Sequence, residues 1–364
     1  MSLPIIIATI LRPDGDTGVQ THFRTFSNWL NDSQKPATIV TPFSTSKIKI
    51  YPTFALRRLI APINGSAGVW WYRHWHTFFL RNELREVLAD GQPCIIYAQC
   101  PLSAGAALEA RKSPVQRVLM VVHFNLSQAD EWCDKGEIPY DGYLFKSIRR
   151  FEETILPRAD GLVFVSQFMR NELIKRIPAL KHTEYRVVPN FLPSPHLGKT
   201  KETPAADLIC IGTLEPRKNQ RYALEIIAAT KRLGKPLNLT VIGDGPDRED
   251  LEKIAKKLKI AENVFFLGFV KQAANRLTQH AAYLHVSHME NLPIAPIEAM
   301  SRGLPIFAPA VGGIPEIFTD GVEGRVIPLN NAEEAARLIL DWMKSPHELV
   351  RAGNAARNKF ISTF

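Results

Sequence analysis

The sequence is poor in cysteine and contains no long apolar run. Only four cysteines stand among its 364 residues, and they form neither a C-x-x-C pair nor a group with interleaved histidines. This spacing argues against a disulfide framework and a structural zinc site, and it favours a reducing compartment. No apolar stretch reaches the roughly 18 residues that a membrane-spanning helix requires, and the N-terminus lacks the basic start of a secretory leader. We therefore expect a cytoplasmic protein that does not span the membrane.

Low-complexity tracts and short repeats are also missing, which excludes a solenoid and a largely disordered chain. The chain is 45% hydrophobic and 22% charged, as globular proteins are. Its length exceeds that of one ordinary core and favours two domains of roughly 150 to 200 residues each.

Acidic residues are the minority among the charged ones, and the net charge of +9 favours anionic partners such as phosphates, nucleic acid or acidic lipid headgroups.

Short β-branched runs alternate with longer helical patterns along the chain. The runs are apolar on both faces, which indicates strands of a covered parallel sheet. The expected strands cover residues 4–10, 37–40, 94–97, 117–122, 161–165, 185–188, 208–211, 237–242, 264–267, 283–286 and 305–308. Helical spacing predicts helices over 103–112, 143–156 and 166–177, the last with Ser166 as its N-cap.

The alternation is interrupted by the polar, proline-rich residues 193–204. Such a composition is typical of a linker. We therefore predict an N-terminal domain over residues 1–192, a linker over 193–206 and a C-terminal domain over 207–364. Repeated strand-helix units on both sides of the linker predict two doubly wound, Rossmann-like α/β domains that face each other across a central cleft.

Ligands of open α/β sheets bind beyond the carboxyl ends of the strands, so functional residues are expected in the turns that follow them. After the first strand, residues 12–18 form a loop with two glycines that leads into a helix containing His22. The Gly18 amide suits a phosphate at the helix start, but an ordinary strand-to-helix turn explains the same residues equally well. His123 directly follows the strand over 117–122, a position that would direct its ring at the cleft, although an isolated histidine is more often structural.

Two adjacent cations, Arg217 and Lys218, follow the first strand of the second half. They stand just before an expected helix, where positive charge opposes the helix dipole unless an anion is bound there. This position favours a diphosphate ligand over the alternative, which is a pair of solvated cations.

The segment 287–300 combines a proline with two carboxylates. Pro293 suits the first turn of a helix, which leaves Glu290 in the preceding loop and places Glu298 inside the helix. Both carboxylates are acceptors suited to paired sugar hydroxyls, and the amides between them suit a phosphate. Glutamates near helix starts also occur for structural reasons, so spacing alone leaves both explanations open.

Taken together, these segments resemble the family 4 glycosyltransferases, which are retaining enzymes of the GT-B architecture. The resemblance covers nearly the whole chain, and its most specific part is the pair Glu290 and Glu298, two glutamates separated by seven residues. Residues around this pair that match the family are Ser287, Pro296, Ala299, Met300, Gly303, Leu304, Pro305, Gly312, Gly313 and Glu316. Weaker matches are residues 188–190, Gly212 with Lys218, residues 243–246 and residues 268–270.

The resemblance implies a hexosyltransferase-like enzyme of class EC 2.4 that uses a nucleotide-sugar, with UDP as the first expectation and GDP as the second. It places Glu290 on hydroxyls of the transferred sugar, Glu298 on the ribose and Lys218 on the diphosphate. His123 would be catalytic together with Glu290, and His22 would contact the acceptor. The implied donor-binding residues are Gly18, Arg217, Lys218, Gly268, Phe269, Val270, Asn291, Leu292, Pro293, Ile294 and Glu298.

The family also implies a mechanism. Its members retain the anomeric configuration, which is commonly explained by front-face attack with the leaving diphosphate accepting the acceptor's proton. Such a mechanism needs electrostatic support more than a protein base. The expected enzyme therefore requires no cofactor and no metal ion.

The chain departs from the family pattern at several positions. Thr213 stands where the family often has arginine, and the first loop has Thr17-Gly18 where the family has two adjacent glycines. Arg217 is a candidate replacement for the missing cation, and Pro293 removes an amide and shifts phosphate binding toward Ile294. The family's last helix, which crosses back onto the first domain, is expected to be missing. Two alternatives remain: a GT-B-fold nucleotide-sugar epimerase and a catalytically silent nucleotide-sugar-binding subunit.

Residues 54–88 mix aromatic and basic side chains densely. They include Arg57, Arg58, Trp70, Trp71, Tyr72, Arg73, Trp75, Phe78, Phe79 and Arg81. One interpretation is peripheral contact with an anionic membrane, at the inner face of the cytoplasmic membrane. The other is a core helix with an arginine-lined outer face. Under the first interpretation, analogy with the family implies a lipid-linked saccharide acceptor in cell-surface polysaccharide biosynthesis. Nucleic acid is not expected as a partner, because the sequence has no basic stripe or known binding motif.

Overall fold

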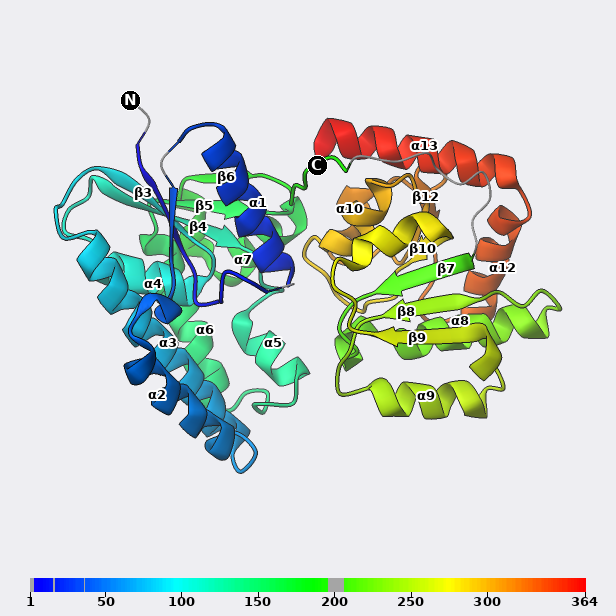
Figure 1. The fold of residues 1–364 in the computed structure, drawn as a ribbon, viewed down its shortest axis with the longest axis horizontal. Coiled ribbons are helices and arrows are strands. Elements are labelled where there is room, and N and C mark those ends of the chain that lie inside the picture. The colour runs from blue at the N-terminus through cyan, green and yellow to red at the C-terminus, as the bar shows by residue number, and fades with distance from the viewer. Residues whose placement is uncertain (1–2, 16, 36, 196–205) are drawn as a thin grey trace. The chain divides into compact units, whose positions relative to one another are not determined.

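The computed structural model describes four stretches of the chain, which are residues 3–15, 17–35, 37–195 and 206–364. They form two compact units, Met1–Pro189 and Asn190–Phe364 (Figure 1). Most of the linker predicted over residues 193–206 lies outside the described residues. The predicted domain limits therefore stay a prediction.

The first unit is built on a parallel sheet with the strand order β2-β1-β3-β4-β5-β6. Its strands are β1 (Ile5–Ala8), β2 (Ala37–Val40), β3 (Cys94–Ala98), β4 (Gln116–Val122), β5 (Gly161–Phe164) and β6 (Tyr185–Val187). Ile7, Ile96 and Met120 are fully buried in this sheet, because helices cover both of its faces. β1 pairs with β2 on one side and with β3 on the other, so the winding reverses there. Sheets of this kind bind ligands at the carboxyl ends of the strands beside such a reversal.

The helices of the first unit begin where the sequence supplies caps. They are α1 (Gly18–Asp32), α2 (Lys47–Ile60), α3 (Gly65–Val87), α4 (Pro101–Ala110), α5 (Gln128–Asp134), α6 (Tyr143–Ile155) and α7 (Gln167–Arg176). Thr17 caps α1 and exchanges hydrogen bonds with Gln20 in a capping box. Ser166 caps α7 by accepting from the Met169 amide at 3.1 Å, which confirms the predicted N-cap.

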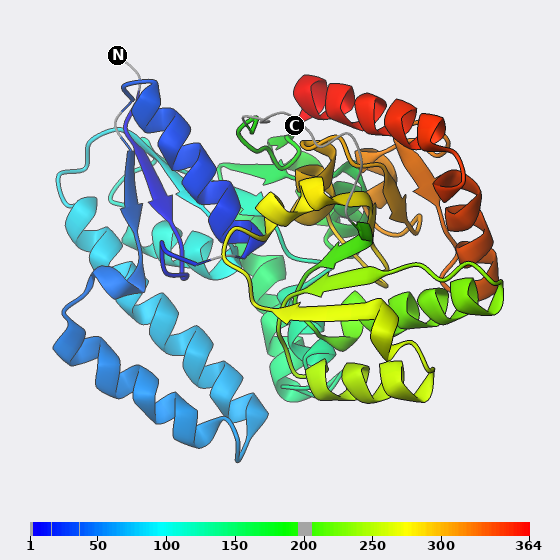
Figure 2. The same ribbon diagram turned by 45° about the vertical axis from the view of Figure 1, so that its right-hand side comes forward.

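Helices α2 and α3 form an antiparallel pair that contains the aromatic and basic stretch (Figure 1 and Figure 2). The Trp71 indole donates to the Thr53 carbonyl at 2.8 Å, and the rings of Phe54 and His76 stack at 4.3 Å. Most of the aromatic residues therefore pack within the unit. The arginines do not share one outer face, since Arg73 is buried. Within the described residues, no helix combines the length and apolarity that crossing a membrane would require.

The second unit has the strand order β12-β11-β10-β7-β8-β9, again in a parallel sheet. The strands are β7 (Ala206–Ile211), β8 (Leu239–Ile242), β9 (Val264–Gly268), β10 (His280–Leu284), β11 (Ile306–Ala308) and β12 (Gly324–Val326). Here the winding reverses at β7, which lies between β8 and β10. Both units are thus doubly wound and Rossmann-like, which confirms the predicted fold class.

The helices of the second unit are α8 (Gln220–Arg232), α9 (Arg248–Lys257), α10 (Ile294–Met300), α11 (Ile314–Ile317), α12 (Ala332–Met343) and α13 (Pro346–Thr363). The end of α13 is tied to the chain that enters this unit. The Leu192 amide donates to the Phe364 carbonyl at 3.1 Å, and Arg357 donates to the Ser194 hydroxyl at 2.8 Å. The expectation of a missing crossover helix stays a prediction.

Candidate functional site

The turn after β7 and the loop after β10 are joined by hydrogen bonds. Asn219 adopts the left-handed conformation, with φ of 56°, and its Nδ2 donates to the Val286 carbonyl at 3.1 Å. The His288 amide donates to the Arg217 carbonyl at 3.0 Å. Because β7 and β10 are neighbours in the sheet, these contacts hold the cationic turn beside the loop that leads to Glu290.

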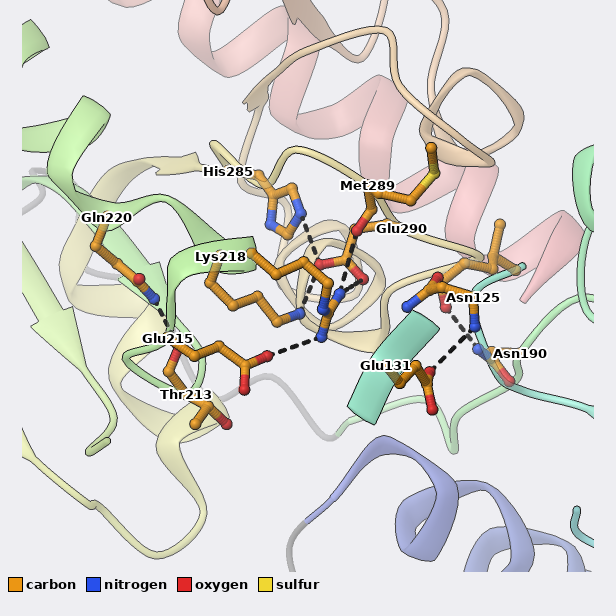
Figure 3. Close-up of polar contacts among 12 residues, drawn as sticks. Asn125, Glu131, Asn190, Thr213, Glu215, Lys218, Gln220, His285, Met289 and Glu290 are labelled. Atoms are coloured by element: carbon orange, nitrogen blue, oxygen red, sulfur yellow. Dashed lines mark hydrogen bonds and ion pairs between the residues drawn. The ribbon is translucent and has the colours of Figure 1, made fainter. Parts of the chain in front are cut away.

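Glu290 lies at the centre of a charge cluster (Figure 3). Its carboxylate is 6% exposed, with Oε1 at 2.5 Å from the Lys218 Nζ and Oε2 at 3.2 Å from the Arg217 guanidinium. The same guanidinium contacts a Glu215 oxygen at 3.0 Å. The Nε2 atom of His285 lies 3.5 Å from Oε1 of Glu290. Three nitrogen-bearing side chains from two loops therefore converge on one buried carboxylate.

The protonation states in the cluster follow from burial and charge. Burial opposes ionisation of Glu290, but Lys218, His285 and Arg217 together outweigh it and hold the pKa of this carboxyl well below its usual value. Burial lowers the pKa of His285, with partial compensation from Glu290, so its ring is neutral at pH 7. The two cations are thus balanced by the carboxylates of Glu290 and Glu215.

A glycine turn fixes the backbone of Glu290. Gly312 has φ of +57°, and a Cβ atom at this position would lie 1.9 Å from the Glu290 carbonyl oxygen. The Gly313 amide donates to that oxygen at 3.0 Å. The close neighbour of this turn is therefore the Glu290 backbone itself.

Glu298 lies one turn into α10, as predicted. Pro293 is the N-cap of this helix, one position before its first residue, Ile294. Burial raises the pKa of Glu298 to about 7, and Arg302 offsets part of this effect. Such a carboxylate is poorly solvated, so a ligand that donates hydrogen bonds to it would favour its ionised form.

The remaining donor-binding candidates of this unit lie either next to Glu290 in the chain or at the end of β9. Leu292 is buried and its carbonyl accepts from Asn190 Nδ2 at 2.6 Å, and Asn291 is buried beside it. Gly268 ends β9 with φ of +67°, and its carbonyl accepts from the Gly243 amide at 2.9 Å. The next side chain, Phe269, is 64% exposed. Val270, which follows, is partly buried.

In the first unit, His123 follows β4 and lines a cavity of about 260 Å³ at the carboxyl ends of β1, β3 and β4. Its Nε2 lies 3.2 Å from Gln99 Oε1, and its ring meets that of His22 edge-on at 4.6 Å. Desolvation, with a smaller contribution from His22, lowers the pKa of His123 well below its usual value. The ring is therefore neutral at pH 7.

The other two candidates of this unit lie at the side of His123 or at the start of α1. His22 is 1% exposed, with Nε2 at 3.2 Å from the Tyr97 hydroxyl, and it is not among the residues that line the cavity. Gly18 is the first residue of α1, next to Thr17, which does line the cavity. Acceptor contact by His22 and phosphate contact by Gly18 remain predictions.

Some side chains of these sites were not singled out from the sequence. In the second unit they are His285 and Glu215, and in the first they are Gln99 and Trp132. Position after a strand was the available signal for His285, which directly follows β10, and for Gln99, which follows β3. In the described part of the chain, no three His, Cys, Asp or Glu side chains are grouped so as to hold a metal ion.

Two family models match the chain, one for each half. Residues 17–193 match the family described as Glycosyltransferase Family 4, and residues 198–359 match the family described as Glycosyl transferases group 1. The matches meet near the boundary between the two compact units.

Curated relatives are similar to only part of the chain. A GDP-mannose-dependent alpha-(1-6)-phosphatidylinositol monomannoside mannosyltransferase from Mycolicibacterium smegmatis is 27% identical over 220 residues, which cover 55% of this chain and 57% of that protein. The chain thus spans about half the length of the curated relatives it matches.

Solved structures share the fold over the full length. Sucrose-phosphate synthase from Thermosynechococcus elongatus has a TM-score of 0.73 at 17% identity, covering 100% of this chain and 95% of its own. The Anabaena protein HepE, solved in complex with UDP, has a TM-score of 0.66 at 17% identity, covering 100% of this chain and 96% of its own. At this identity the likeness shows the GT-B fold alone.

Proposed function

We propose, from the premise that the chain belongs to glycosyltransferase family 4, that it transfers a sugar from a nucleotide-sugar donor to a saccharide or lipid-linked saccharide acceptor. The observation that supports this function is the cluster at the strand ends of the second unit. There Lys218 and Arg217 supply charge for a diphosphate, and the buried carboxylate of Glu290 supplies an acceptor for sugar hydroxyls.

The donor and the Glu290 carboxylate share the same cations. Lys218 is 20% exposed, so a diphosphate oxygen from solvent can reach its ammonium group. When it does, Glu290 loses its shortest contact and becomes available to hydroxyls of the transferred sugar. Glu298 is assigned to the ribose and residues 268–270 to the base.

The proposed reaction retains the anomeric configuration and uses no metal ion. The bond between C1 of the sugar and the diphosphate breaks, a bond from C1 to the acceptor oxygen forms, and the acceptor's proton passes to the leaving diphosphate. Lys218 and Arg217 stabilise the charge that develops on the diphosphate. We assign the neutral ring of His123, which contacts Gln99, to hydrogen bonding with a hydroxyl of the reacting sugar.

The choice of nucleotide is tested by thermal unfolding of the whole chain with UDP, GDP, ADP, CMP and their common sugars. A ligand at roughly 100 times its dissociation constant should stabilise the native state by about 2.7 kcal/mol. UDP is expected first and GDP second, and Lys218→Ala should abolish the shift. No shift with any nucleotide would refute the donor site.

Mass spectrometry of the products then separates transfer from the alternatives. Sugar attached to an acceptor supports the transferase. Epimerised donor without any acceptor would identify an epimerase, and binding without turnover would identify a silent subunit. Either of the last two outcomes would refute the proposed reaction.

The membrane contact of the proposed enzyme is assigned to α2. Ile48, Leu59 and Ile63 are 85%, 68% and 87% exposed, and Ile48 and Leu59 lie eleven residues apart on one helical face, with Ile63 just beyond the helix end. With Arg58 exposed beside them, this surface combines apolar and cationic character, which suits an anionic membrane.

Co-sedimentation with vesicles tests this contact. The variant Leu59→Ser/Ile63→Ser should bind vesicles of anionic phospholipid at least tenfold more weakly than the unmodified chain. The control Val350→Ser/Ile361→Ser removes side chains of similar exposure, 63% and 64%, from α13 and should bind normally. Equal loss in both variants would contradict the assignment to α2.

A further inference from the structure

Arg73 on α3 carries a buried positive charge at the wall of the cavity beside His123. Only 9% of Arg73 is exposed, and no other arginine or lysine whose side chain the structure describes reaches this degree of burial. Buried cations are normally paired with a carboxylate, because an unpaired charge is costly to remove from water. The contacts of Arg73 therefore show whether its buried charge is balanced within the protein.

No carboxylate within the described residues forms an ion pair with Arg73. Its guanidinium donates to the neutral amide Gln128 Oε1 at 3.0 Å and lies 5.5 Å from the centre of the Phe151 ring. Glu152 is the acid with a favourable influence on it, but this carboxylate is already paired with Arg176 at 2.7 Å. Glu152 also accepts from the Ser127 hydroxyl and the Gln128 amide, both at 2.8 Å. The charge of Arg73 is thus left without a partner of its own.

The cavity offers the chemistry of a saccharide site around this cation. Trp132 and Tyr72 present aromatic rings, Gln99 and His123 present hydrogen-bonding groups, and Glu131 and Lys135 add one charge of each sign. A mixture of aromatic faces and a few polar groups is typical of small-molecule sites. The site therefore suits a saccharide that carries an anionic group within reach of Arg73.

Arg73 also lines a second hollow, of about 240 Å³, whose lining residues belong to α3, α4 and α6. Its apolar lining includes Trp70, Phe78, Leu144 and Phe151, and its polar lining consists of Arg73, His74, Thr77, Arg81 and Ser147. The guanidinium thus stands between two cavities that both combine apolar and polar side chains. The aromatic side chains of the second hollow suit the hydrocarbon chain of a lipid-linked saccharide phosphate.

We propose that the cavity of the first unit receives the acceptor and that Arg73 binds a phosphate group of it. This inference rests on the proposed function, since it assigns the acceptor side of the same reaction. The phosphate is carried either by a lipid-linked acceptor, whose chain occupies the second hollow, or by a soluble saccharide phosphate. Phosphate is favoured over a neutral saccharide because it supplies the counter-charge that Arg73 lacks, through paired hydrogen bonds that the planar guanidinium is shaped to make.

Calorimetric titration of the whole chain tests the proposal with three probes: inorganic phosphate, geranyl phosphate and the neutral methyl glucoside. Saturating nucleoside diphosphate is present throughout, so that the cations near Glu290 are already occupied. We expect the two phosphates to bind at least tenfold more tightly than methyl glucoside. Arg73→Gln should weaken both at least tenfold, and Arg73→Lys should fall between because lysine keeps the charge and loses the planar fork.

Arg117→Gln is the matched control. Arg117 lies on β4 of the same unit, is 51% exposed and does not line the cavity, so its loss should leave phosphate binding unchanged. Tighter binding of geranyl phosphate than of inorganic phosphate identifies a lipid-linked source, and equal binding identifies a soluble saccharide phosphate. Both outcomes support the role of Arg73.

The proposal is overturned if the unmodified chain does not prefer phosphate to methyl glucoside, or if Arg73→Gln binds phosphate as tightly as the unmodified chain. The first comparison needs no variant, so it decides even if Arg73→Gln fails to fold. Stabilisation by the nucleotide-sugar is measured in parallel. Its presence in Arg73→Gln would show that the donor site stands independently, whereas its absence in the unmodified chain would contradict the proposed function instead.

Discussion

Replacing Glu290 with glutamine removes the charge at the centre of the cluster while keeping the size of the side chain. Removing one partner of a buried ion pair costs about 3 to 5 kcal/mol, because the other charge is left uncompensated. Lys218 and Arg217 are 20% and 19% exposed, and Arg217 keeps its contact with Glu215, so water and that contact offset part of the loss. We therefore expect Glu290→Gln to lower the free energy of unfolding by about 2 to 3 kcal/mol at pH 7.

The pH dependence of this loss has a defined sign. The pKa of Glu290 is held below its usual value of 4.5 in the folded state. Its stabilising effect is therefore complete above pH 4.5 and is lost as the pH falls below that value. Urea unfolding followed by circular dichroism at pH 7 and at decreasing pH measures both quantities. Equal stability of the two proteins at pH 7 would refute the reasoning.

The same variant separates binding from transfer. Without the Glu290 charge, Lys218 is released for a phosphate, so free nucleoside diphosphate should bind several-fold more tightly while sugar transfer falls at least about 100-fold. Glu323→Gln is the control, since Glu323 is also buried in the second unit but accepts from the Thr319 amide at 2.7 Å, away from the cluster. It should leave nucleotide affinity unchanged. Weaker diphosphate binding by Glu290→Gln would contradict competition between Glu290 and the donor.

Three further outcomes follow from single positions. Because the pKa of Glu298 is raised to about 7, its contribution to stability is lost as the pH rises through 7, and Glu298→Gln should remove this slope in unfolding experiments. Nucleotide affinity should rise over the same pH range if the ionised carboxylate accepts from the ribose, which calorimetry at pH 6 and 8 measures. Gly312→Ala should cost more than about 2 kcal/mol in thermal unfolding, because its Cβ meets the Glu290 carbonyl, whereas Gly321→Ala, with φ of +79° and open space, should cost only about 1 kcal/mol. Arg73→Met should be at least as stable as the unmodified chain without ligand, since it removes an unpaired buried charge, and a lower melting temperature would contradict that description.

The strands show where sequence patterns suffice. β2 was predicted with its observed limits, Ala37–Val40, because a short apolar run between polar residues leaves little choice. β10 was placed too late, since it begins at His280, whose ring nitrogen bonds to Thr240 at 2.8 Å and so tolerates burial. β12 was missed because its three residues, Gly324–Val326, carry no strand pattern. Its position depends on pairing with β11, which is a tertiary contact.

The candidate site likewise combines features that the local sequence predicts with features that depend on tertiary contacts. The sequence predicted that Glu290 lies in a loop and that Glu298 lies inside the following helix. Both positions depend on where the helix starts, which the local sequence indicates. The contact of Lys218 with Glu290 joins residues 72 positions apart, so only the fold reveals it. Arg73 illustrates the opposite error, since a helix rich in arginine suggested an exposed cationic face. Burial of that side chain depends on the packing of α3 against other helices, which the sequence pattern does not specify.

The two sites differ in how their cations are balanced, and this difference has a consequence for the donor. Under the proposed function, a diphosphate that binds Lys218 displaces Glu290, at the cost of a buried carboxylate that loses its shortest partner. A sugar on the diphosphate offers that carboxylate new hydroxyl donors and so compensates the loss. We therefore expect the nucleotide-sugar to bind at least tenfold more tightly than the nucleoside diphosphate alone, and this advantage should vanish in Glu290→Ala. Calorimetry with both ligands on both proteins measures it, and equal affinities for the unmodified chain would show that Glu290 does not exchange its cations for the sugar.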